Sequence, residues 1–321
     1  MTTRFAAPRI SFFSLFVALC LASLATPRLV CAQTGLDLGA SSFQFLKLSL
    51  SPRVDAMGGA GAALAGGPSE AEINPAVVAG QKGALALGQE YPPKEFGTRA
   101  SSIGWSLPWD GRRVLLHARY LGFDAIPGWN ADNNATTAYG AHTLKLQAGL
   151  AGQNYGFDWG GSAAYARNNI ADASYSALLA NAGVRHDVSV GFLPGSLSLG
   201  GAVDNAALWA GKTQETGETL ELPTIWRAGV GYTRDLKPGS RVIVAVDARK
   251  TDKEDLVFPV GVEYRMLEAL QLRAGYPVGD PDNGFALGVG LKWSRFAFNY
   301  AYKNHSTLSG GHSWTLEIGD L

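Results

Sequence analysis

Residues 285–302 read FALGVGLKWSRFAFNYAY, and large apolar side chains occupy every second position on either side of a short break. Successive side chains of a β-strand point to opposite faces, so each half presents one apolar face. The other face of the first half is mostly glycine and alanine, with a single lysine, Lys292. A turn around Ser294 separates the halves at hairpin distance. The sequence therefore predicts two antiparallel strands with one apolar and one glycine-rich face.

The same alternation recurs along most of the chain and predicts fourteen strands. In the clearest segments every charged residue falls on the second face, which is rich in glycine rather than in Lys and Glu, as in a crowded interior. A soluble β-sandwich also alternates apolar with polar residues and is the competing architecture. The predicted strands lie near 84–90, 101–108, 113–121, 143–152, 157–167, 177–185, 197–204, 225–234, 242–249, 257–265, 270–276, 284–293, 295–302 and 312–318.

The connections between these strands alternate in length. The longest, 122–142 and 205–224, follow odd-numbered strands, whereas most connections after even-numbered strands are tight turns; 186–196 breaks this pattern. Bacterial outer-membrane barrels combine even strand numbers with short periplasmic turns and longer external loops. Residues 81–321 are therefore predicted to form an all-β, transmembrane antiparallel barrel of about 14 strands. Trp129 and Trp209 are the predicted partner contacts of the two long external loops, which alternatively only shield the barrel mouth.

The first 32 residues have the pattern of a secretory signal peptide. Arg4 and Arg9 precede an apolar run over 10–25, and a permitted cleavage site ends at Ala32. Cys20 and Cys31 both lie in this segment, so a disulfide scaffold or thiolate metal site is excluded. We expect export to the outer membrane of a Gram-negative-type bacterium. No later apolar run approaches the roughly 20 residues of a membrane helix.

Composition excludes two further classes. Lys+Arg and Asp+Glu balance at 27 each, which is not the excess of positive charge that nucleic-acid binding requires. An apolar content of 46% is too high for a disordered chain. Glycine supplies 40 of 321 residues, well above the usual share.

Residues 33–80 do not alternate and contain many small residues. Arg53 is followed by Met57-Gly58-Gly59-Ala60 and later by Asn74-Pro75-Ala76. A run of small residues suits a chain that packs closely inside a glycine-lined barrel, and Pro75 marks a break before the first strand. The segment is predicted to be an N-terminal plug or hatch in the lumen, with an unstructured periplasmic tail as the alternative. The plug motif comprises Arg53, Met57, Gly58, Gly59, Asn74 and Pro75.

These motifs resemble the PorV/PorQ family of outer-membrane proteins, relatives of the FadL-type fourteen-stranded barrels. The C-terminal run from Phe298 to Tyr302, followed by Leu308, Gly310 and His312, resembles the last hairpin of that family. The ending at Leu321 departs from the aromatic last residue of many barrels. The resemblance implies a role in protein secretion or surface attachment through a type IX-like pathway, with secretion-system proteins or exported cargo as partners.

No catalytic constellation is expected, and the protein is predicted to be non-enzymatic, with no cofactor and no metal site. The five histidines are scattered without metal-ligand spacing, and adjacent loop residues such as Asn304-His305-Ser306 do not make a triad. Two functions compete with the secretion role: a FadL-like channel for uptake of hydrophobic small molecules, and a structural or adhesion barrel that binds a partner through its external loops. In all three the predicted lumen-lining residues are Arg227, Asp247, Arg249, Glu263, Arg265, Arg273 and Lys292.

Overall fold

The computed structural model describes residues 43–129, 134–191, 194–213, 217–267 and 269–320. The expected signal peptide over 1–32, with both cysteines, lies outside the described residues, as do residues 33–42 of the expected plug. Residues 130–133 and 214–216, which belong to the two expected long loops, also lie outside them.

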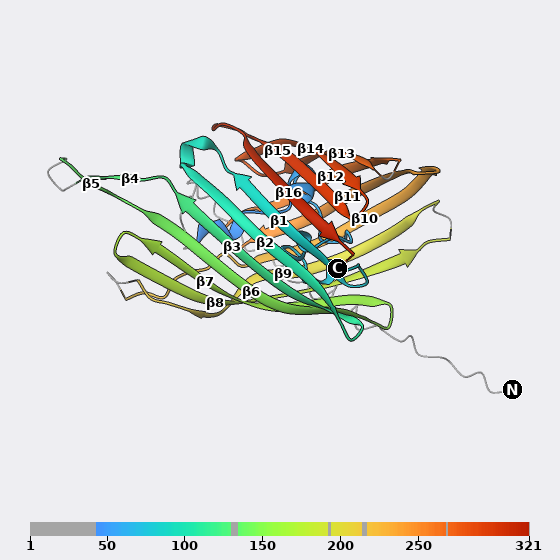
Figure 1. Cartoon of the computed structure of the whole chain (residues 1–321), viewed down its shortest axis with the longest axis horizontal. Helices are drawn as coiled ribbons and strands as arrows, with labels where there is room; N and C mark the ends of the chain where they lie inside the picture. Colours follow the sequence, from blue (N-terminus) through green and yellow to red (C-terminus); the bar gives the residue numbers. More distant parts are fainter. Residues whose placement is uncertain (1–42, 130–133, 192–193, 214–216, 268, 321) are drawn as a thin grey trace. The chain divides into compact units, whose positions relative to one another are not determined.

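Fourteen strands of the described chain form one closed antiparallel barrel, in which consecutive strands pair and β1 closes the ring against β16 (Figure 1). This confirms the predicted fold class and all fourteen predicted strands. They are β1 (Ala84–Tyr91), β2 (Thr98–Trp109), β3 (Arg112–Phe123), β6 (Ala141–Asn154), β7 (Phe157–Ile170), β8 (Ala173–Ser189), β9 (Ser196–Ala210), β10 (Ile225–Lys237), β11 (Ser240–Thr251), β12 (Leu256–Met266), β13 (Leu270–Val278), β14 (Asn283–Trp293), β15 (Phe296–His305) and β16 (Gly311–Gly319).

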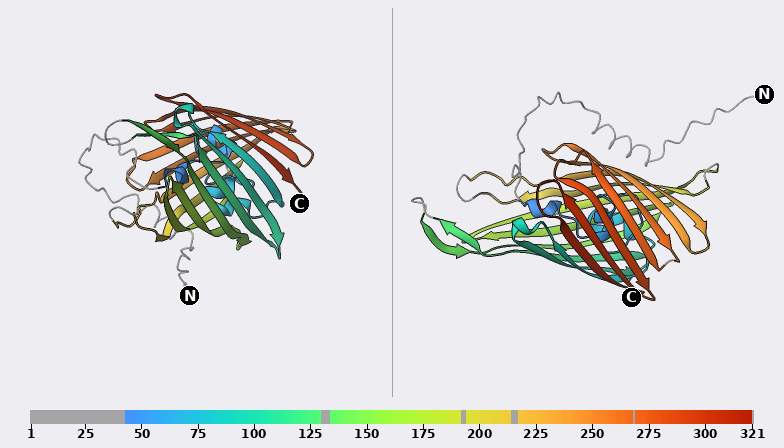
Figure 2. Two further views of the ribbon diagram at one scale, coloured as in Figure 1. Left: turned by 60° about the vertical axis from the view of Figure 1, so that its left-hand side comes forward. Right: turned by 90° about the horizontal axis from the view of Figure 1, so that it is seen from above.

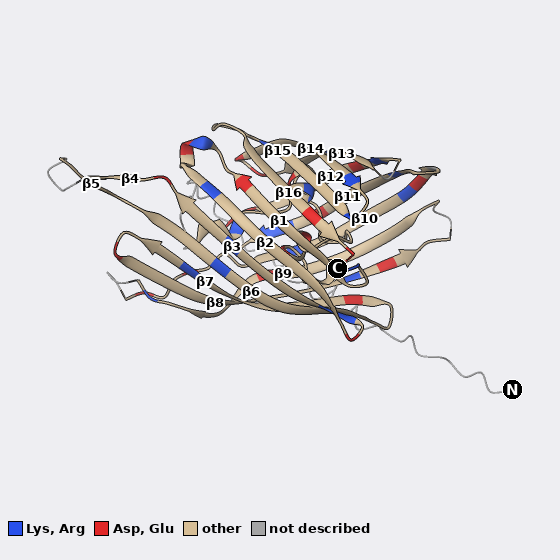
Figure 3. Ribbon diagram, viewed as in Figure 1, with Lys and Arg blue, Asp and Glu red and all other residues tan. Residues whose placement is uncertain are grey.

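The apolar face of each strand is turned outward. On β12, Phe258 and Val262 are each more than 40% exposed, while Gly261 and Glu263 between and beside them are buried inside the barrel. A soluble protein would bury the apolar row instead. Figure 3 shows long stretches of strand without any charged residue. The outward apolar surface is therefore that of a barrel whose solvent is lipid.

Two ends of the barrel can be distinguished by their connections. At the turn end, short turns such as 110–111, 155–156 and 294–295 join the strands; at the loop end lie the longer connections, including 211–224. The strand β1 begins and β16 finishes at the turn end. The connection between β8 and β9, residues 190–195, also lies at the turn end but is longer than a tight turn. It corresponds to 186–196, the connection that breaks the predicted pattern of lengths.

Trp209 was predicted to lie in an external loop, but it lies on β9, paired with Leu178 of β8. The β8–β9 ladder shifts register between Ala180 and Ala182 and again between Leu178 and Leu179. Such bulges interrupt the strict alternation on which the sequence-based boundary depends. The strand therefore continues to Ala210, and the loop that follows is shorter than 205–224.

The connection between β3 and β6 contains a second, separate sheet. Strands β4 (Ile126–Trp129) and β5 (Ala135–Tyr139) pair with each other and not with the barrel, and the hairpin extends beyond the ends of the neighbouring strands (Figure 1). Trp129 ends β4, opposite Ala135. The sequence predicts an irregular loop here, because the hairpin strands are short and their alternation is weak.

Among the described residues, helical turns occur only in the segment before the barrel and in one loop. They are η1 (Gln44–Lys47), α2 (Pro52–Ala56), η2 (Glu70–Glu72), η3 (Pro75–Val78) and η4 (Lys94–Phe96). None of these helices in the described part of the chain has the length and apolar character needed to cross a membrane.

Candidate functional site

Residues 43–79, called here the N-terminal segment, lie against the inner faces of the strands (Figure 2). The helix α2 packs on β13, β14, β15 and β16, whereas η3 packs on β6, β7 and β8. These groups of strands belong to different parts of the barrel wall. The segment therefore crosses the interior from one wall to another.

Glycine allows the segment to touch the wall with its backbone. A Cβ atom on Gly275 of β13 would lie 2.1 Å from the Met57 carbonyl carbon, and one on Gly261 of β12 would lie 2.6 Å from the Met57 oxygen. Gly58 adopts φ +69°, a left-handed conformation that side chains disfavour. The Met57-Gly58 backbone consequently packs directly on the wall, where any side chain would prevent the contact.

Two side-chain caps set the local shape of the segment. The Ser51 hydroxyl accepts a hydrogen bond from the Val54 amide at the start of α2, where Pro52 fits the first helical position. The Asn74 side chain accepts from the Ala76 amide and donates to the Ala62 carbonyl at 2.7 Å and to Val184 of β8 at 3.2 Å. Asn74 thus fixes a turn of the segment and ties it to the wall.

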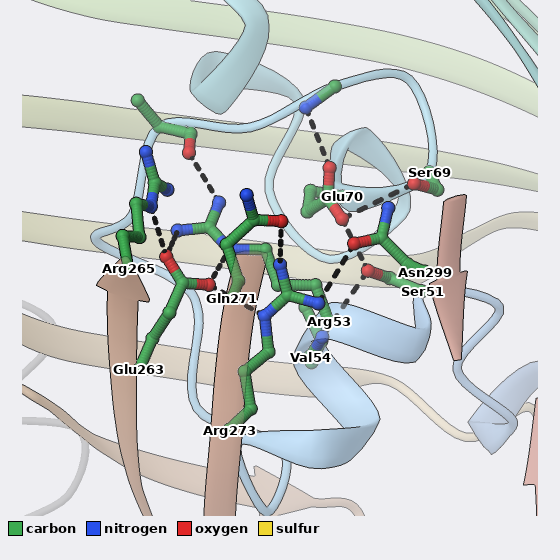
Figure 4. A network of polar contacts seen from close by, with 12 residues as sticks. Ser51, Arg53, Val54, Ser69, Glu70, Glu263, Arg265, Gln271, Arg273 and Asn299 are labelled. Atoms are coloured by element: carbon green, nitrogen blue, oxygen red, sulfur yellow. Dashed lines mark hydrogen bonds and ion pairs between the residues drawn. The ribbon is translucent and has the colours of Figure 1, made fainter. Parts of the chain in front are cut away.

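The carboxylate of Glu263 joins the segment to strands β12 and β13 (Figure 4). It is fully buried and accepts hydrogen bonds from Arg53 Nε at 2.8 Å, Arg265 Nε at 2.6 Å and Arg273 Nε at 2.7 Å. Arg273 also donates to Asn299 Oδ1 of β15 at 2.8 Å. We call these five residues the Glu263 network. One carboxylate holds three guanidinium groups, so its removal would leave buried positive charge without compensation.

Other charged wall residues bind the segment through its backbone. Asp247 Oδ2 of β11 accepts from the amides of Gly61 and Ala62, each at 2.9 Å. Arg185 of β8 donates to the Ala63 carbonyl at 2.8 Å and pairs with Asp158 at 2.7 Å. These contacts satisfy backbone groups that no secondary structure would pair.

A second buried cluster centres on Glu72 of η2. Its carboxylate forms an ion pair with Arg119 of β3 and lies 3.1 Å from His117 Nδ1 and 3.7 Å from Lys145 Nζ. Burial alone would raise the pKa of Glu72, but the neighbouring Arg119, His117 and Lys145 hold this pKa well below its usual range. Glu72 therefore stays ionised at neutral pH. An adjoining polar pocket of about 20 Å³ has room for about one water molecule.

Between the Glu72 cluster and the loop end of the barrel, the interior contains a group of apolar side chains. Phe43, Phe45 and Leu46 of the N-terminal segment pack with Leu220 and Leu222 of the loop 211–224 and with small or branched side chains of the wall. We call this group the apolar cluster. The wall contributes Ala100, Leu121, Ala164, Ala166, Ala177 and Leu179, and Leu50 completes the buried set. Loop, segment and wall thus share one apolar core, and displacement of the side chains of the segment would leave an apolar site of the kind that binds uncharged hydrophobic molecules.

The seven predicted lumen residues occupy different environments. Glu263, Arg273 and Arg265 belong to one network; Arg227 pairs with Asp204 at 3.1 Å, and Arg249 pairs with Asp280 at 3.0 Å. Asp247 caps the segment, as described above, and Lys292 is exposed near the end of β14. Lys292 is thus the most exposed of the seven, whereas the side chains of Arg265 and Arg249 are partly exposed and the other four are buried.

The residues that complete the site could not be predicted from the sequence. Glu72 and Arg119 belong to no recognisable motif, and Phe43, Phe45 and Leu46 precede the barrel without a periodic pattern. The weak available signal is the run Phe45-Leu46-Lys47, which places two large apolar residues in a segment that contains many small ones. Among the described residues no group of three His, Cys, Asp or Glu side chains could hold a metal ion.

No protein-family model matches the chain, and no curated protein sequence matches it. Solved structures of outer-membrane channels do match its fold. The toluene transporter TodX of Pseudomonas putida superimposes with a TM-score of 0.54 at 12% identity, over 84% of this chain and 96% of that chain.

Two further solved barrels have the same arrangement of strands. The toluene transporter TbuX of Ralstonia pickettii gives a TM-score of 0.51 at 13% identity, over 84% of this chain and 96% of that one. A FadL homologue of Pseudomonas aeruginosa gives 0.50 at 12% identity, over 84% and 98%. At these identities the likeness concerns the fold alone: the closed barrel of this chain is similar in fold to these solved channels and to the FadL homologue.

Proposed function

We propose that this protein is a non-enzymatic outer-membrane channel through which hydrophobic small molecules enter, with the loop end outside the cell. The observation that carries the proposal is the apolar cluster, which lies inside the barrel directly beneath the loop 211–224. The solved barrels of the same fold include proteins described as monoaromatic hydrocarbon channels and toluene transporters. A hydrophobic ligand would replace the contacts that Phe43 and Phe45 make with the wall.

Charge and packing in the interior disfavour a general pore for polar solutes. Below the apolar cluster the segment is held by the Glu263 network and the Glu72 cluster, whose charges are paired across the lumen. Mixed charges paired in this way brace a narrow interior and leave no row of free charge for ions to follow. The proposed route therefore begins in the apolar cluster and requires movement of the N-terminal segment.

The substitution Leu222→Asp tests the ligand site. Leu222 is buried in the apolar cluster, and a carboxylate there would oppose apolar ligands because it must stay hydrated. We expect binding of radiolabelled toluene to protein in lipid nanodiscs, measured by equilibrium dialysis against empty discs, to weaken at least about tenfold. Thr219→Asp, on the exposed side of the same loop, is the matched control and should bind as the unaltered protein does. Equal toluene binding by both variants would contradict the proposal.

We further propose that the N-terminal segment acts as the plug of this channel. Deleting residues 40–75 removes the backbone that packs on Gly261 and Gly275. It also removes Arg53 from the Glu263 network and Glu72 from the second charged cluster. We expect single-channel conductance in planar bilayers to rise from a closed level to a stable open level. Conductance that is unchanged in a correctly folded deletion variant would show that the segment does not block the lumen.

The secretion role implied by the PorV/PorQ resemblance stays a prediction, as does the adhesion role. No solved barrel reported above is described as a secretion component. The separate hairpin β4–β5 is the external feature on which an adhesion role would depend. Neither role would use the apolar cluster inside the barrel, whereas a channel for hydrophobic molecules would. The channel is therefore the function that the geometry favours.

A further inference from the structure

The outer wall of the barrel carries a groove that the proposed channel does not use. It has a volume of about 470 Å³ and crosses the outward faces of β2, β3, β6 and β7. We call it the wall groove. Its lining residues are Ile103, Trp105, Leu116, His117, Ala118, Leu146, Gln147, Ala148 and Ala163.

The strand register explains why this part of the wall is hollow. Leu116 of β3 pairs with Ala148 of β6, which pairs with Ala163 of β7, so two alanines stand side by side on the outward face. Ile103 and Leu146 rise beside them and are each about 45% exposed. Small side chains between large ones leave a depression that is apolar throughout its outward lining.

On β7 small residues continue from the groove toward the turn end, whereas on β6 Leu150 stands on the outward face between Ala148 and Gly152. Two positions beyond Ala163 on β7 is Gly161, and the outward neighbour of Trp159 on β6 is Gly152. A Cβ atom on Gly161 would meet only one backbone oxygen, at 3.8 Å, so the wall there is low and open. The groove therefore continues as a shallow apolar track toward the row that contains Trp159.

An arginine stands at the end of this track. Arg112, the first residue of β3, is exposed, and its guanidinium carbon lies 6.0 Å from the Trp159 ring centroid. A Cβ on Gly152 would lie 3.4 Å from Arg112 Cγ, which places the arginine stem over that glycine. In the described part of the chain no carboxylate forms an ion pair with Arg112. Its charge is therefore available to an external anion.

We propose that the wall groove and Arg112 together bind one anionic phospholipid. An acyl chain occupies the groove, and the phosphate group accepts hydrogen bonds from the Arg112 guanidinium. Arginine suits this role because its planar fork matches phosphate oxygens and is weakly hydrated. The groove is continuous with the lipid-facing surface of the wall, so the site is open to lipid and closed to soluble ligands.

The dimensions agree with one lipid leaflet. Four residues of extended strand separate Ala163 from Trp159, about 13 Å along the strand at roughly 3.3 Å per residue, or about 10 Å along the membrane normal at a strand tilt of about 40°. Half of a bilayer core is about 15 Å. The groove therefore lies near the middle of the membrane when Arg112 and Trp159 lie at the headgroup level, where tryptophan is favoured.

The barrel offers a matched control at the same end. Arg295, in the turn 294–295, also lies over an aromatic ring, with its guanidinium carbon 5.3 Å from the Phe296 centroid. Its outward neighbours are large, among them Trp293 and Phe298, each exposed on the wall. Arg295 thus has the cation of the proposed site without the groove.

Native mass spectrometry of the full chain, released from mixed micelles that contain equal phosphatidylglycerol and phosphatidylcholine, tests the proposal. We expect the unaltered protein to retain one phosphatidylglycerol in preference to phosphatidylcholine. Arg112→Gln should reduce this retention about tenfold, as loss of a charge-assisted hydrogen bond would. Ala148→Leu, which fills the groove, should reduce retention of both lipids. Arg295→Gln should change neither.

Two results would overturn the proposal. One is equal retention of both lipids by the unaltered protein, which would mean that the groove has no headgroup preference. The other is an equal loss with Arg295→Gln and Arg112→Gln, which would show that any cation at this end attracts lipid. Heat-modifiable migration in gels shows whether the barrel of each variant is folded. If Ala148→Leu does not fold, the milder Ala163→Val fills the groove in its place.

Discussion

Glu263→Gln is expected to lower the free energy of unfolding by about 3–5 kcal/mol, because breaking a buried ion pair leaves the partner charges uncompensated. Here the partners are three: Arg53 of the N-terminal segment and Arg265 and Arg273 of the wall all donate to this one carboxylate. Glutamine keeps the size of the side chain but removes its charge. The three guanidinium groups would then repel one another with no carboxylate between them.

The measurement is the urea midpoint of folding into phospholipid vesicles, followed by heat-modifiable migration in gels. The control is Asp235→Asn, which breaks the exposed pair between Asp235 and Arg241 at the end of β10 and should leave the midpoint unchanged. The double variant Arg53→Gln/Glu263→Gln should lose less than the sum of the single losses, because the residues interact directly. Strict additivity would contradict the role assigned to the network.

Val262→Arg is expected to lower the free energy of unfolding by about 2–4 kcal/mol, the cost of an arginine on the lipid face near the bilayer midplane. Val262 lies in the middle of β12 with its side chain outward and 43% exposed, and its neighbours on β11 and β13 are Val244 and Ala274. An arginine there has no carboxylate beside it. It must remain in hydrocarbon or distort the membrane to reach water.

The matched control is Thr307→Arg in the exposed loop 306–310, where the new charge stays in water. The same vesicle-folding assay compares the two variants at equal lipid composition. If both variants fold with the same midpoint, the outward row does not face lipid and the barrel does not span a membrane.

Much of the fold follows from alternation in the sequence, because a barrel wall between lipid and lumen imposes a strict two-residue period. All fourteen strands could be predicted for this reason. The period fails where the wall itself is irregular, as at the bulges of β8 and β9, and there the boundary and the position of Trp209 were wrong. The hairpin β4–β5 could not be predicted, because it is not part of the barrel wall and its side chains do not alternate between lipid and lumen.

The interior site could be predicted only in part. Charged residues that alternate with the outward apolar residues of a strand must point into the barrel. Glu263, Arg273 and Asp247 could therefore be assigned to the lumen from the sequence. Their partners could not, since Arg53 and Glu263 are 210 positions apart and no local pattern connects them. Phe43 and Leu222 meet in the apolar cluster for the same reason: closure of the ring, not sequence spacing, brings them together.

The closing pair of strands constrains the order in which the molecule can be assembled. Residues 84–91 of β1 pair with 312–319 of β16, so the seam joins parts of the chain separated by almost the whole barrel, and such contacts form slowly because a long loop must close first. The N-terminal segment crosses the interior and touches walls on both sides. Once the seam has formed, the paired strands leave only the ends of the barrel as a way in. We expect residues 43–79 to be enclosed while the seam is still open, because Arg53 and Glu72 can then reach their wall partners Glu263 and Arg119 without passing through a closed barrel.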